Sequence, residues 1–296
     1  MKIIISGSNG LVGSAIIPAL TAGGHEVKRL LRARTRPGGE HWDPERGELK
    51  SGALEGFDAI IHLAGESIAS GRWTSARKER IYRSRVDGTR LLSEALNKLA
   101  RPPKVLLSAS AIGFYGDRGA EGLTEESAIG SFFLSHLCQD WEAATEPASV
   151  VGIRVVNLRF GIILSAKGGA LAKMLFPFRL GLGGKIGSGA QFMSWVAIED
   201  VVGVIQHALT TESLTGAVNV VSPDPVTNEV FTKCLGKVLG RPTIFPMPAL
   251  AARLVFGEMA DELLLASTRV APAKLQKTGY IFRHPHLEEA LPALLG

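Results

Sequence analysis

The sequence predicts an α/β protein with a doubly wound parallel sheet and a smaller, mainly helical lobe towards its C-terminal end. Short apolar runs alternate with amphipathic helical segments through the first half of the chain, a pattern typical of parallel strands covered by helices on both faces. A glycine-rich turn follows the first apolar run directly and opens the first helix. The composition is that of a globular protein, with 46% hydrophobic and 21% charged residues among 296.

The elements of the first half follow from these apolar runs. A fully buried strand begins at Lys2, and the helix after the glycine-rich turn stops at Gly23-Gly24, because glycine ends helices readily. The longest helix carries Ile81, Leu91 and Leu92 on its apolar side. We expect strands at 2–5, 26–31, 59–63, 105–107 and 151–158, and helices at 11–22, 74–99 and 132–144.

The pattern changes in the second half of the chain. Residues 168–193 are rich in glycine and basic residues, and strand and helix signals resume at 196–209 and 217–221. The last part of the chain indicates mainly helices, punctuated by prolines. We therefore expect a larger domain over 1–222, in which 165–195 crosses toward the second lobe, and a small substrate lobe over 223–296 that covers the ligand-binding edge of the sheet.

The net charge has two interpretations, solubility alone or an anionic ligand such as a phosphorylated cofactor. The formal net charge is +5 and the pI is about 9.3. The basic residues are spread along the sequence rather than clustered, so nucleic acid is not expected as a partner. A small, anionic substrate fits this balance, and a homodimer is compatible with it.

Cysteine usage and hydropathy indicate a reducing, cytoplasmic setting. Cys138 and Cys234 lie in neither a metal-binding nor a paired spacing. The apolar start of the chain ends too early for an export signal, and the apolar stretch at 250–265 is broken by charged residues, so no membrane span is expected. His284-Pro285-His286 lacks two further ligands, and no metal site is expected.

The glycine-rich turn has the spacing of a dinucleotide-binding fingerprint. It reads G-x-x-G-x-x-G, between a strand and a helix. The first glycine allows the tight turn, the second lets a pyrophosphate approach the backbone, and the third lets the helix pack close to the sheet. The helix N-terminus offers free N–H groups to phosphates. A purely structural turn is the alternative. The predicted cofactor-binding residues here are Gly7, Ser8, Asn9, Gly10, Leu11, Val12 and Gly13.

The end of the second strand indicates which dinucleotide binds. Rossmann-type folds specific for NAD place an acidic residue there to bind the ribose 2′-hydroxyl. This chain has Arg32 at that point and no carboxylate. Arg32 can pair with a 2′-phosphate, and Arg34 or Arg36 can assist. The sequence therefore predicts NADP(H) as the cofactor, with a solvated basic loop as the alternative.

Further motifs follow in order along the chain. His62-Leu63-Ala64-Gly65 comes after a buried strand, Ser108-Ala109-Ser110 ends another strand, and Phe114-Tyr115-Gly116 follows it. The stretch 195–201 reads Trp-Val-Ala-Ile-Glu-Asp-Val. With the fingerprint, these segments resemble the extended short-chain dehydrogenase/reductase superfamily, which includes sugar-nucleotide epimerases and dehydratases. In that resemblance, the segment at His62 lies beneath the adenine-ribose.

A narrower likeness covers essentially the whole chain. Trp141-Glu142-Ala143-Ala144, the segment 177–184 and Gly187-Ser188-Gly189 resemble an "epimerase family protein" group. Its C-terminal domain of unknown function resembles 235–295 here. By resemblance, further cofactor contacts are expected from Leu63, Ala64, Gly65, Arg80, Arg85, Ser108 and Ile163.

The superfamily's acid/base pair is absent from this sequence. That pair is a tyrosine with a lysine four residues later, whose charge lowers the tyrosine pKa. Val86, Gly119 and His284 stand four residues after the three tyrosines. On the helix that should carry the pair, Phe133 and Leu137 stand near the expected positions, and neither can move a proton.

Two residues are the candidate catalytic groups in its place. Ser110 lies past the end of a strand and could donate a hydrogen bond to a substrate oxygen; a turn-capping serine is the alternative. Tyr115 could act as the acid if Arg118 or another neighbour lowers its pKa, whereas packing over the nicotinamide is its alternative role. Three further residues have a possible role near the active site. Glu66 is a base or a helix cap, and His136 is a proton shuttle or a surface residue. Cys138 is expected to be an inert buried thiol.

A glycine-rich loop in the second half could wrap the anionic substrate. Gly181 to Gly189 is flanked by Arg179 and Lys185, and glycine backbones with a basic residue suit phosphate or carboxylate. A flexible crossover loop is the alternative. Two functions remain open: an NADP-dependent oxidoreductase or epimerase-like enzyme with a non-standard acid/base, and a non-catalytic NADP(H)-binding sensor or scaffold protein.

Overall fold

One eight-stranded sheet forms the centre of the molecule in the computed structural model, which describes residues 1–32, 39–50 and 52–296. The strand order is β12-β8-β6-β5-β1-β2-β3-β4, and neighbouring strands are parallel except β3 and β4. The doubly wound α/β fold predicted from the sequence is confirmed. Its strands are β1 (Lys2–Ser6), β2 (Glu26–Leu31), β3 (Gly39–Asp43), β4 (Glu48–Leu49), β5 (Ala59–His62), β6 (Val105–Ala111), β8 (Arg154–Phe160) and β12 (Gly216–Val220).

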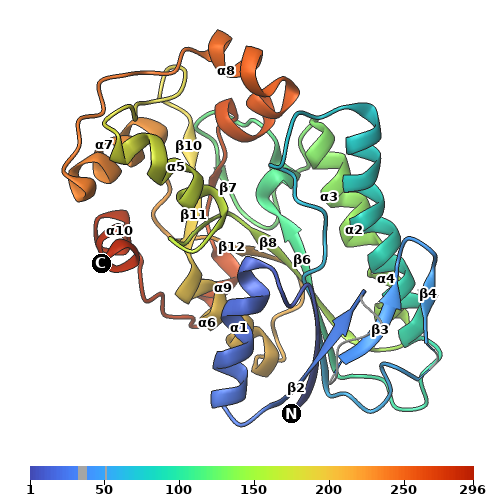
Figure 1. The fold of residues 1–296 in the computed structure, drawn as a ribbon. Helices are drawn as coiled ribbons and strands as arrows, with labels where there is room; N and C mark the ends of the chain where they lie inside the picture. The colour runs from blue at the N-terminus through green and yellow to red at the C-terminus, as the bar shows by residue number, and fades with distance from the viewer. Residues whose placement is uncertain (33–38, 51) are drawn as a thin grey trace.

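Helices cover both faces of this sheet (Figure 1). On one face lie α1 (Leu11–Ala22) and α6 (Ile198–Thr210), and on the other lie α2 (Ser75–Leu96), α3 (Phe133–Ala143) and α4 (Glu146–Val150). Ile3 and Ile5 belong to the core under α1 and α6, whereas Ile4 belongs to the core under α2. Because β1 is buried on both faces, its sequence is a continuous apolar run.

The strand order places β1 between β2 and β5, so the chain winds away from β1 in both directions. In such sheets the crevice at the carboxyl ends of the strands, where the winding reverses, is where ligands bind. Figure 1 shows α5 (Gly169–Arg179), α7 (Asn228–Leu239) and α8 (Ala249–Phe256) gathered above that edge.

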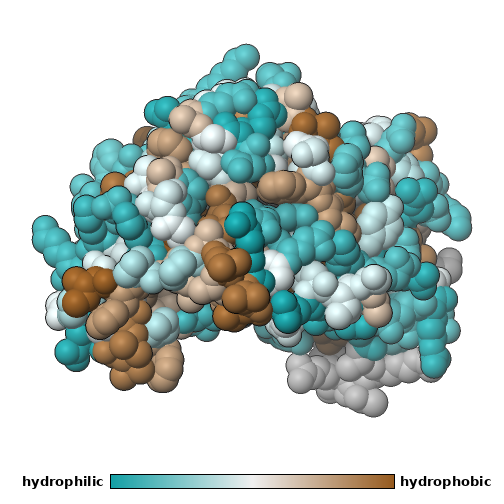
Figure 2. Space-filling model, turned by 90° about the horizontal axis from the view of Figure 1, so that it is seen from above, coloured by the Kyte–Doolittle hydropathy of each residue, from teal (hydrophilic) through white to brown (hydrophobic). Residues whose placement is uncertain are grey.

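A separate core holds most of the second half together. Leu171 of α5, Phe231 of α7 and Leu291 of α10 (Leu287–Leu295) pack in it. Four short strands connect this core to the large sheet, as the parallel pair β9 (Ile162–Leu164) and β11 (Trp195–Ala197) and the antiparallel pair β10 (Phe192–Met193) and β13 (Val226–Thr227). Seen from above in Figure 2, hydrophobic residues gather near the lower left edge and the centre of this face.

The C-terminal part of the chain also returns to the large sheet. β14 (Arg269–Val270) pairs with β7 (Gly122–Leu123), and α9 (Ala273–Lys277) follows it. Leu275 lies in the core under α1 and α6, with Tyr280 and Phe282 packed against that core. The division into 1–222 and 223–296 stays a prediction.

Within the central sheet, two strands were not expected from the sequence. β3 and β4 are mostly polar and half-buried, with only Trp42 deeply buried, so they lack the apolar run that marks the other strands. None of the described helices is long and apolar enough to cross a membrane. Among the residues that the structure places, no three His, Cys, Asp or Glu side chains come together as a metal site would require.

Candidate cofactor and active site

Two of the three fingerprint glycines are demanded by the protein's own packing. Gly7 has φ +69°, and a Cβ there would lie 2.6 Å from the carbonyl carbon of Leu63. A Cβ on Gly13 would lie 2.4 Å from the Gly7 carbonyl oxygen. Any side chain at either position would therefore push two turns of backbone apart.

Gly10 is less tightly enclosed than Gly7 and Gly13, although a Cβ there would still make one close contact. A Cβ on Gly10 would meet only the Gly7 carbonyl oxygen, at 3.3 Å, and the residue's φ of −76° is open to any amino acid. No side chain caps the N-terminus of α1, and the buried Ser8 hydroxyl has no hydrogen-bond partner in the structure. Free N–H groups, an unpaired hydroxyl and an open approach together fit a pyrophosphate.

The other fingerprint residues line the opening of α1. Leu11 packs beside the N-terminus of α5, where a Cβ on Gly169 would lie 3.1 Å from its Cδ2 atom. Val12 packs against the core under α1 and α6, as does Ile163 of β9. The structure thus brings Ile163 to the same end of α1 as the fingerprint, because the carbonyl oxygen of Ile163 also lies 3.6 Å from that Cβ position.

A buried histidine ties the fingerprint turn to the turn after β5. The Ser6 hydroxyl accepts hydrogen bonds from the backbone N–H groups of Leu63 and Ala64, at 3.2 and 3.3 Å. Its oxygen lies 2.6 Å from His62 Nδ1, and His62 Nε2 lies 3.1 Å from the Thr89 hydroxyl. Burial lowers the pKa of His62 from 6.5 to about 4, so this ring is neutral near neutral pH. We call Gly7–Gly13 with Leu63–Gly65 the cradle.

The end of β2 carries the residues expected to select the cofactor. Arg32 is largely exposed, and its NH1 atom lies 3.7 Å from Glu45. Arg34 and Arg36 lie outside the described residues. Arg29, which the sequence analysis did not consider, donates a hydrogen bond from NH1 to the Asn9 side-chain oxygen at 3.4 Å. The parallel pairing of β2 with β1, which places Arg29 opposite Ile5, could have indicated this.

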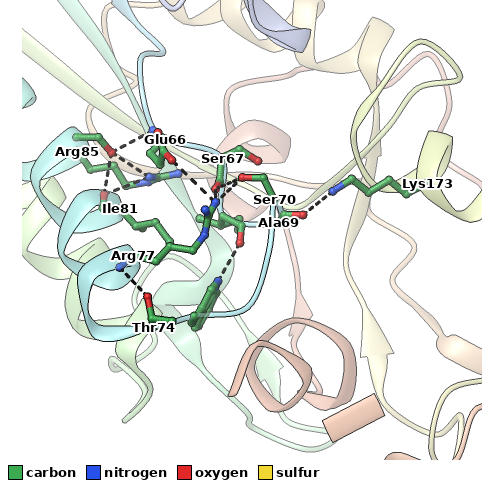
Figure 3. Close-up of polar contacts among 12 residues, drawn as sticks. Glu66, Ser67, Ala69, Ser70, Thr74, Arg77, Ile81, Arg85 and Lys173 are labelled. Carbon is green, nitrogen blue, oxygen red and sulfur yellow. Dashed lines mark hydrogen bonds and ion pairs between the residues drawn. The ribbon is translucent and has the colours of Figure 1, made fainter. Parts of the chain in front are cut away.

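Two arginines of α2, Arg77 and Arg85, lie beside Glu66, the residue that directly follows the cradle (Figure 3). The Arg85 guanidinium lies 5.1 Å from the centre of the Trp141 ring, and a Cβ on Gly65 would be 3.3 Å from its Cζ atom. Burial lowers the pKa of Arg85 to about 10. Arg80 is exposed on the same helix. Glu66 lies between two arginines, with its carboxylate 4.0 Å from Arg77 NH2.

The segment from Glu66 to Thr74, which we call the strap, is fastened from two sides. Arg77 donates to the Ser67 carbonyl oxygen at 2.6 Å and to the Ser70 hydroxyl. From the other side, Lys173 of α5 donates to the Ala69 carbonyl oxygen at 2.7 Å (Figure 3). The strap therefore joins α2 to the helices above the sheet.

The two candidate catalytic residues belong to one buried polar network. Ser110 Oγ donates to Glu142 at 2.7 Å, and Glu142 forms a bidentate ion pair with Arg159 at 2.7 and 2.8 Å. Arg159 NH1 donates to the Tyr115 hydroxyl at 2.9 Å, and that hydroxyl donates to Asn219 at 2.7 Å. These five residues form what we call the floor network. Sequence reasoning missed the roles of Glu142, Arg159 and Asn219.

Burial sets the protonation of this network. Ser110 is 2% exposed and Tyr115 is 0% exposed. Burial raises the pKa of Tyr115, although the neighbouring Arg159 opposes this. Burial alone would lower the pKa of Arg159, but the Glu142 carboxylate raises it above its usual range. Arg118, considered as a partner for Tyr115, instead forms an ion pair with Glu121 at 2.7 Å.

The helix α3, where the superfamily carries its Tyr–Lys pair, presents an apolar side here. Phe133 and Leu137 pack in a cluster with Trp73. His136 is exposed, and burial raises the pKa of Cys138 to about 12, which fits an inert thiol. The N-terminus of α3 is held by Glu262, whose carboxylate accepts the first two backbone N–H groups at 3.0 and 2.9 Å.

Ser108 lies deeper than the other predicted cofactor residues. It is 0% exposed, its hydroxyl has no partner in the structure, and it stands between His62 and Asn157 in the strand register. Because it lies two residues before Ser110 on the same strand, both side chains face α3.

Packing accounts for two of the glycines in the loop 181–189. A Cβ on Gly184 would lie 1.9 Å from the Phe245 carbonyl oxygen, and one on Gly183 would lie 2.6 Å from the Phe178 ring. Lys185 lies 3.7 Å from Glu229. The interpretation of this loop as a crossover segment accounts for these two glycines without a ligand, and an anionic substrate at the loop stays a prediction.

Comparison with known proteins gives matches over the whole chain. The model of the "NAD dependent epimerase/dehydratase family" matches residues 3–221, and that of a "Domain of unknown function (DUF1731)" matches residues 247–294. Epimerase family protein Mb2239 of Mycobacterium bovis is 42% identical over 290 residues, covering 98% of this chain and 96% of that protein. Epimerase family protein SDR39U1 of Homo sapiens is 37% identical, with 100% of both chains covered.

Solved structures agree with these sequence relatives. The crystal structure of human epimerase family protein SDR39U1 with NADPH has a TM-score of 0.90 and 36% identity, covering 99% of each chain. A nucleoside-diphosphate sugar epimerase from Corynebacterium glutamicum has a TM-score of 0.84 and 39% identity; it covers 100% of this chain, which spans 58% of that one. UDP-N-acetylglucosamine 4-epimerase from Bacillus cereus, at 16% identity and a TM-score of 0.77, shares the fold.

Proposed function

We propose that this chain, which belongs to the NAD dependent epimerase/dehydratase family, binds NADP(H) in the cradle as an oxidoreductase or epimerase-like enzyme with a non-standard acid/base. The observation that carries the proposal is the difference among the fingerprint glycines. Backbone atoms under 3.0 Å away exclude a Cβ at Gly7 and Gly13, whereas a Cβ on Gly10 would meet one protein atom within 4 Å, at 3.3 Å. The human relative solved with NADPH supports the same cofactor.

The residues of the cradle fit the parts of such a cofactor. The uncapped N-terminus of α1 and the unpaired Ser8 hydroxyl suit the pyrophosphate, and the turn at Leu63–Gly65 suits the adenine-ribose. Arg32 suits the 2′-phosphate. The family resemblance adds Arg80, Arg85 and Ile163 to this set, and the bound nicotinamide would supply the hydride chemistry.

On the substrate side, we assign different tasks to the two candidate residues. Ser110 stands at the carboxyl end of β6 and already donates to Glu142, so it can orient a substrate oxygen and relay a proton between that oxygen and the Glu142 carboxyl group, towards the substrate in reduction and away from it in oxidation. Tyr115 is fully buried and saturated with hydrogen bonds, so it acts through Arg159 as a positioning residue. A small anionic substrate fits the net charge of +5 and the arginines around Glu66.

A second function, the non-catalytic sensor or scaffold, is favoured by the pKa shifts of the buried side chains around the site. The pKa of His62 is lowered to about 4, that of Cys138 is raised to about 12, and burial raises that of Tyr115. None of these shifts moves a proton donor towards neutral pH, which is where general acid–base catalysis works best.

Turnover assays distinguish the two functions. A panel of UDP-sugars and small carbonyls is incubated with NADPH and the wild-type protein, Ser110→Ala, Tyr115→Phe and the double variant. We expect no 4-epimerisation of UDP-sugars and slow carbonyl reduction, which the double variant lowers by about 10²–10⁴-fold, the usual contribution of general acid–base groups. NADPH binding without any turnover supports the sensor. Unchanged reduction in the double variant removes both residues as candidates.

A further inference from the structure

A cationic side chain of β2, that of Arg29, reaches the fingerprint turn. Arg29 stands in register with Ile5 of β1, and its side chain extends to Asn9, the third residue of the fingerprint. The guanidinium NH1 atom donates to the Asn9 amide oxygen at 3.4 Å, which is long for a hydrogen bond. The structure therefore places a positive charge beside the turn, held only loosely.

This charge differs from that of Arg32 at the end of the same strand. Arg32 lies 3.7 Å from Glu45, and both side chains are largely exposed, at 71% and 83%. In the part of the chain that the structure describes, Arg29 has no carboxylate within ion-pair distance, and the Asn9 amide is neutral. Phosphate oxygens are stronger acceptors for a guanidinium than a neutral amide oxygen is, so a phosphate would displace Asn9 readily.

We propose that Arg29 is the anchoring ligand for the 2′-phosphate of the cofactor, with Arg32 as an outer second cation. This inference rests on the proposed NADP(H) binding. In dinucleotide-binding folds the adenine-ribose lies between the fingerprint turn and the end of the second strand, and Arg29 spans these two places. On binding, Arg29 releases the Asn9 oxygen and donates to the phosphate monoester, and the Asn9 amide can turn its N–H group to the same oxygens.

The experiment measures cofactor discrimination rather than activity. NADPH, NADH and the fragments adenosine 2′,5′-bisphosphate and adenosine 5′-monophosphate are titrated into the wild type, Arg29→Gln, Arg32→Gln and Asn9→Ala. Gln keeps an amide near Asn9 but removes the charge. Arg101→Gln is the matched control, because Arg101 is also exposed. It lies before the amino end of β6, whereas the cradle lies at the carboxyl ends of the strands.

We expect Arg29→Gln to weaken NADPH and the bisphosphate by about ten- to a hundredfold, the range of one hydrogen bond to a charged group. NADH and the monophosphate should bind as before, and Arg32→Gln should have the smaller effect. If Arg29→Gln weakens NADPH and NADH equally, Arg29 only supports the fingerprint turn. If Arg29→Gln leaves NADPH binding unchanged, Arg32 selects the cofactor. Either result overturns the role of Arg29 but leaves the proposed NADP(H) binding intact. A wild type without preference for NADPH overturns the proposed cofactor as well.

Discussion

The cradle and the floor network lie at the same edge of the sheet, but they differ in whether their polar groups already have hydrogen-bond partners. In the cradle, no side chain among the described residues caps the N-terminus of α1, and none of them pairs with the Ser8 hydroxyl. In the floor network, the Glu142 carboxylate accepts from Ser110 and Arg159, and the Tyr115 hydroxyl both donates and accepts. A site with unsatisfied donors is prepared for a ligand, whereas a saturated network holds its own members in place.

This contrast separates what the molecule binds from what it can transform. The open groups of the cradle gain partners only when an anion arrives, so ligand binding there need not break existing bonds. In the floor network, a substrate oxygen that pairs with Ser110 must compete with Glu142. Four predictions test this difference, from the largest expected effect to the smallest.

Substitution of the fingerprint glycines should separate ligand effects from folding effects. Gly10→Val places a side chain where the pyrophosphate approaches, and we expect it to abolish NADPH binding while circular dichroism shows a folded protein. Gly13→Ala is the contrasting variant, because its Cβ would lie 2.4 Å from the Gly7 carbonyl oxygen. We expect that variant to lose stability as well. Normal NADPH affinity in folded Gly10→Val would make the motif purely structural.

Breaking the buried ion pair should affect stability more than binding. Arg159→Met leaves the Glu142 carboxylate buried beside Ser110 without its counter-ion, and removal of one partner from such a pair costs about 3–5 kcal/mol of unfolding free energy. The measurement is chemical denaturation. Glu142→Gln/Arg159→Met should recover part of the loss, since no charge is then left unpaired. Loss of NADPH affinity comparable to the loss of stability would show that cradle and floor network are coupled.

The neutral histidine under the cradle predicts a pH dependence of stability. The folded protein holds the pKa of His62 at about 4, below its ordinary 6.5. Between these values the unfolded chain binds the proton and the folded protein does not, so stability is fully present above pH 6.5 and is lost as pH falls towards 4. The shift corresponds to about 3 kcal/mol. Denaturation midpoints of wild type and His62→Asn, measured from pH 7 to 4, should converge as pH falls; parallel curves would contradict this.

Reversal of charge at the end of β2 should have the smallest effect. Wild type should bind NADPH at least about tenfold tighter than NADH, a difference of roughly 1.4 kcal/mol. Arg32→Glu should erase this preference, because a carboxylate repels the 2′-phosphate and accepts the ribose hydroxyl. Calorimetric titration of both cofactors measures this. Equal affinities of the wild type for NADPH and NADH would contradict the assignment of Arg32 to the 2′-phosphate.

Local patterns made most of the fold predictable from the sequence. The strands β1 and β5 are short apolar runs, and the fingerprint sits directly after one of them, so their placement needs only neighbouring residues. β3 was missed because its polar residues carry no period-two apolar signal. Its single deeply buried residue, Trp42, is recognisable only through its packing in the core under α2.

The floor network shows why the candidate site was only partly predictable. Ser110 and Tyr115 were found because they stand beside a strand end and a Tyr-Gly turn. Glu142 and Arg159 come from α3 and β8, and Asn219 comes from β12, so only the folded sheet brings them to the same two hydroxyls. Arg29 was missed for a related reason, since its contact with Asn9 depends on the pairing of β1 with β2.

The return of the C-terminal segment to the large sheet also bears on how the protein is made. All eight strands of the central sheet have been synthesised once the ribosome passes Val220. The apolar face under α1 and α6 still lacks Leu275, Tyr280 and Phe282 at that moment. The nascent chain therefore exposes an incomplete hydrophobic surface until residues 275–282 have been made, and exposed apolar surface of this kind is what chaperones recognise. Chains ending at residue 222 and at residue 296, compared after release from the ribosome, should differ sharply in protease resistance.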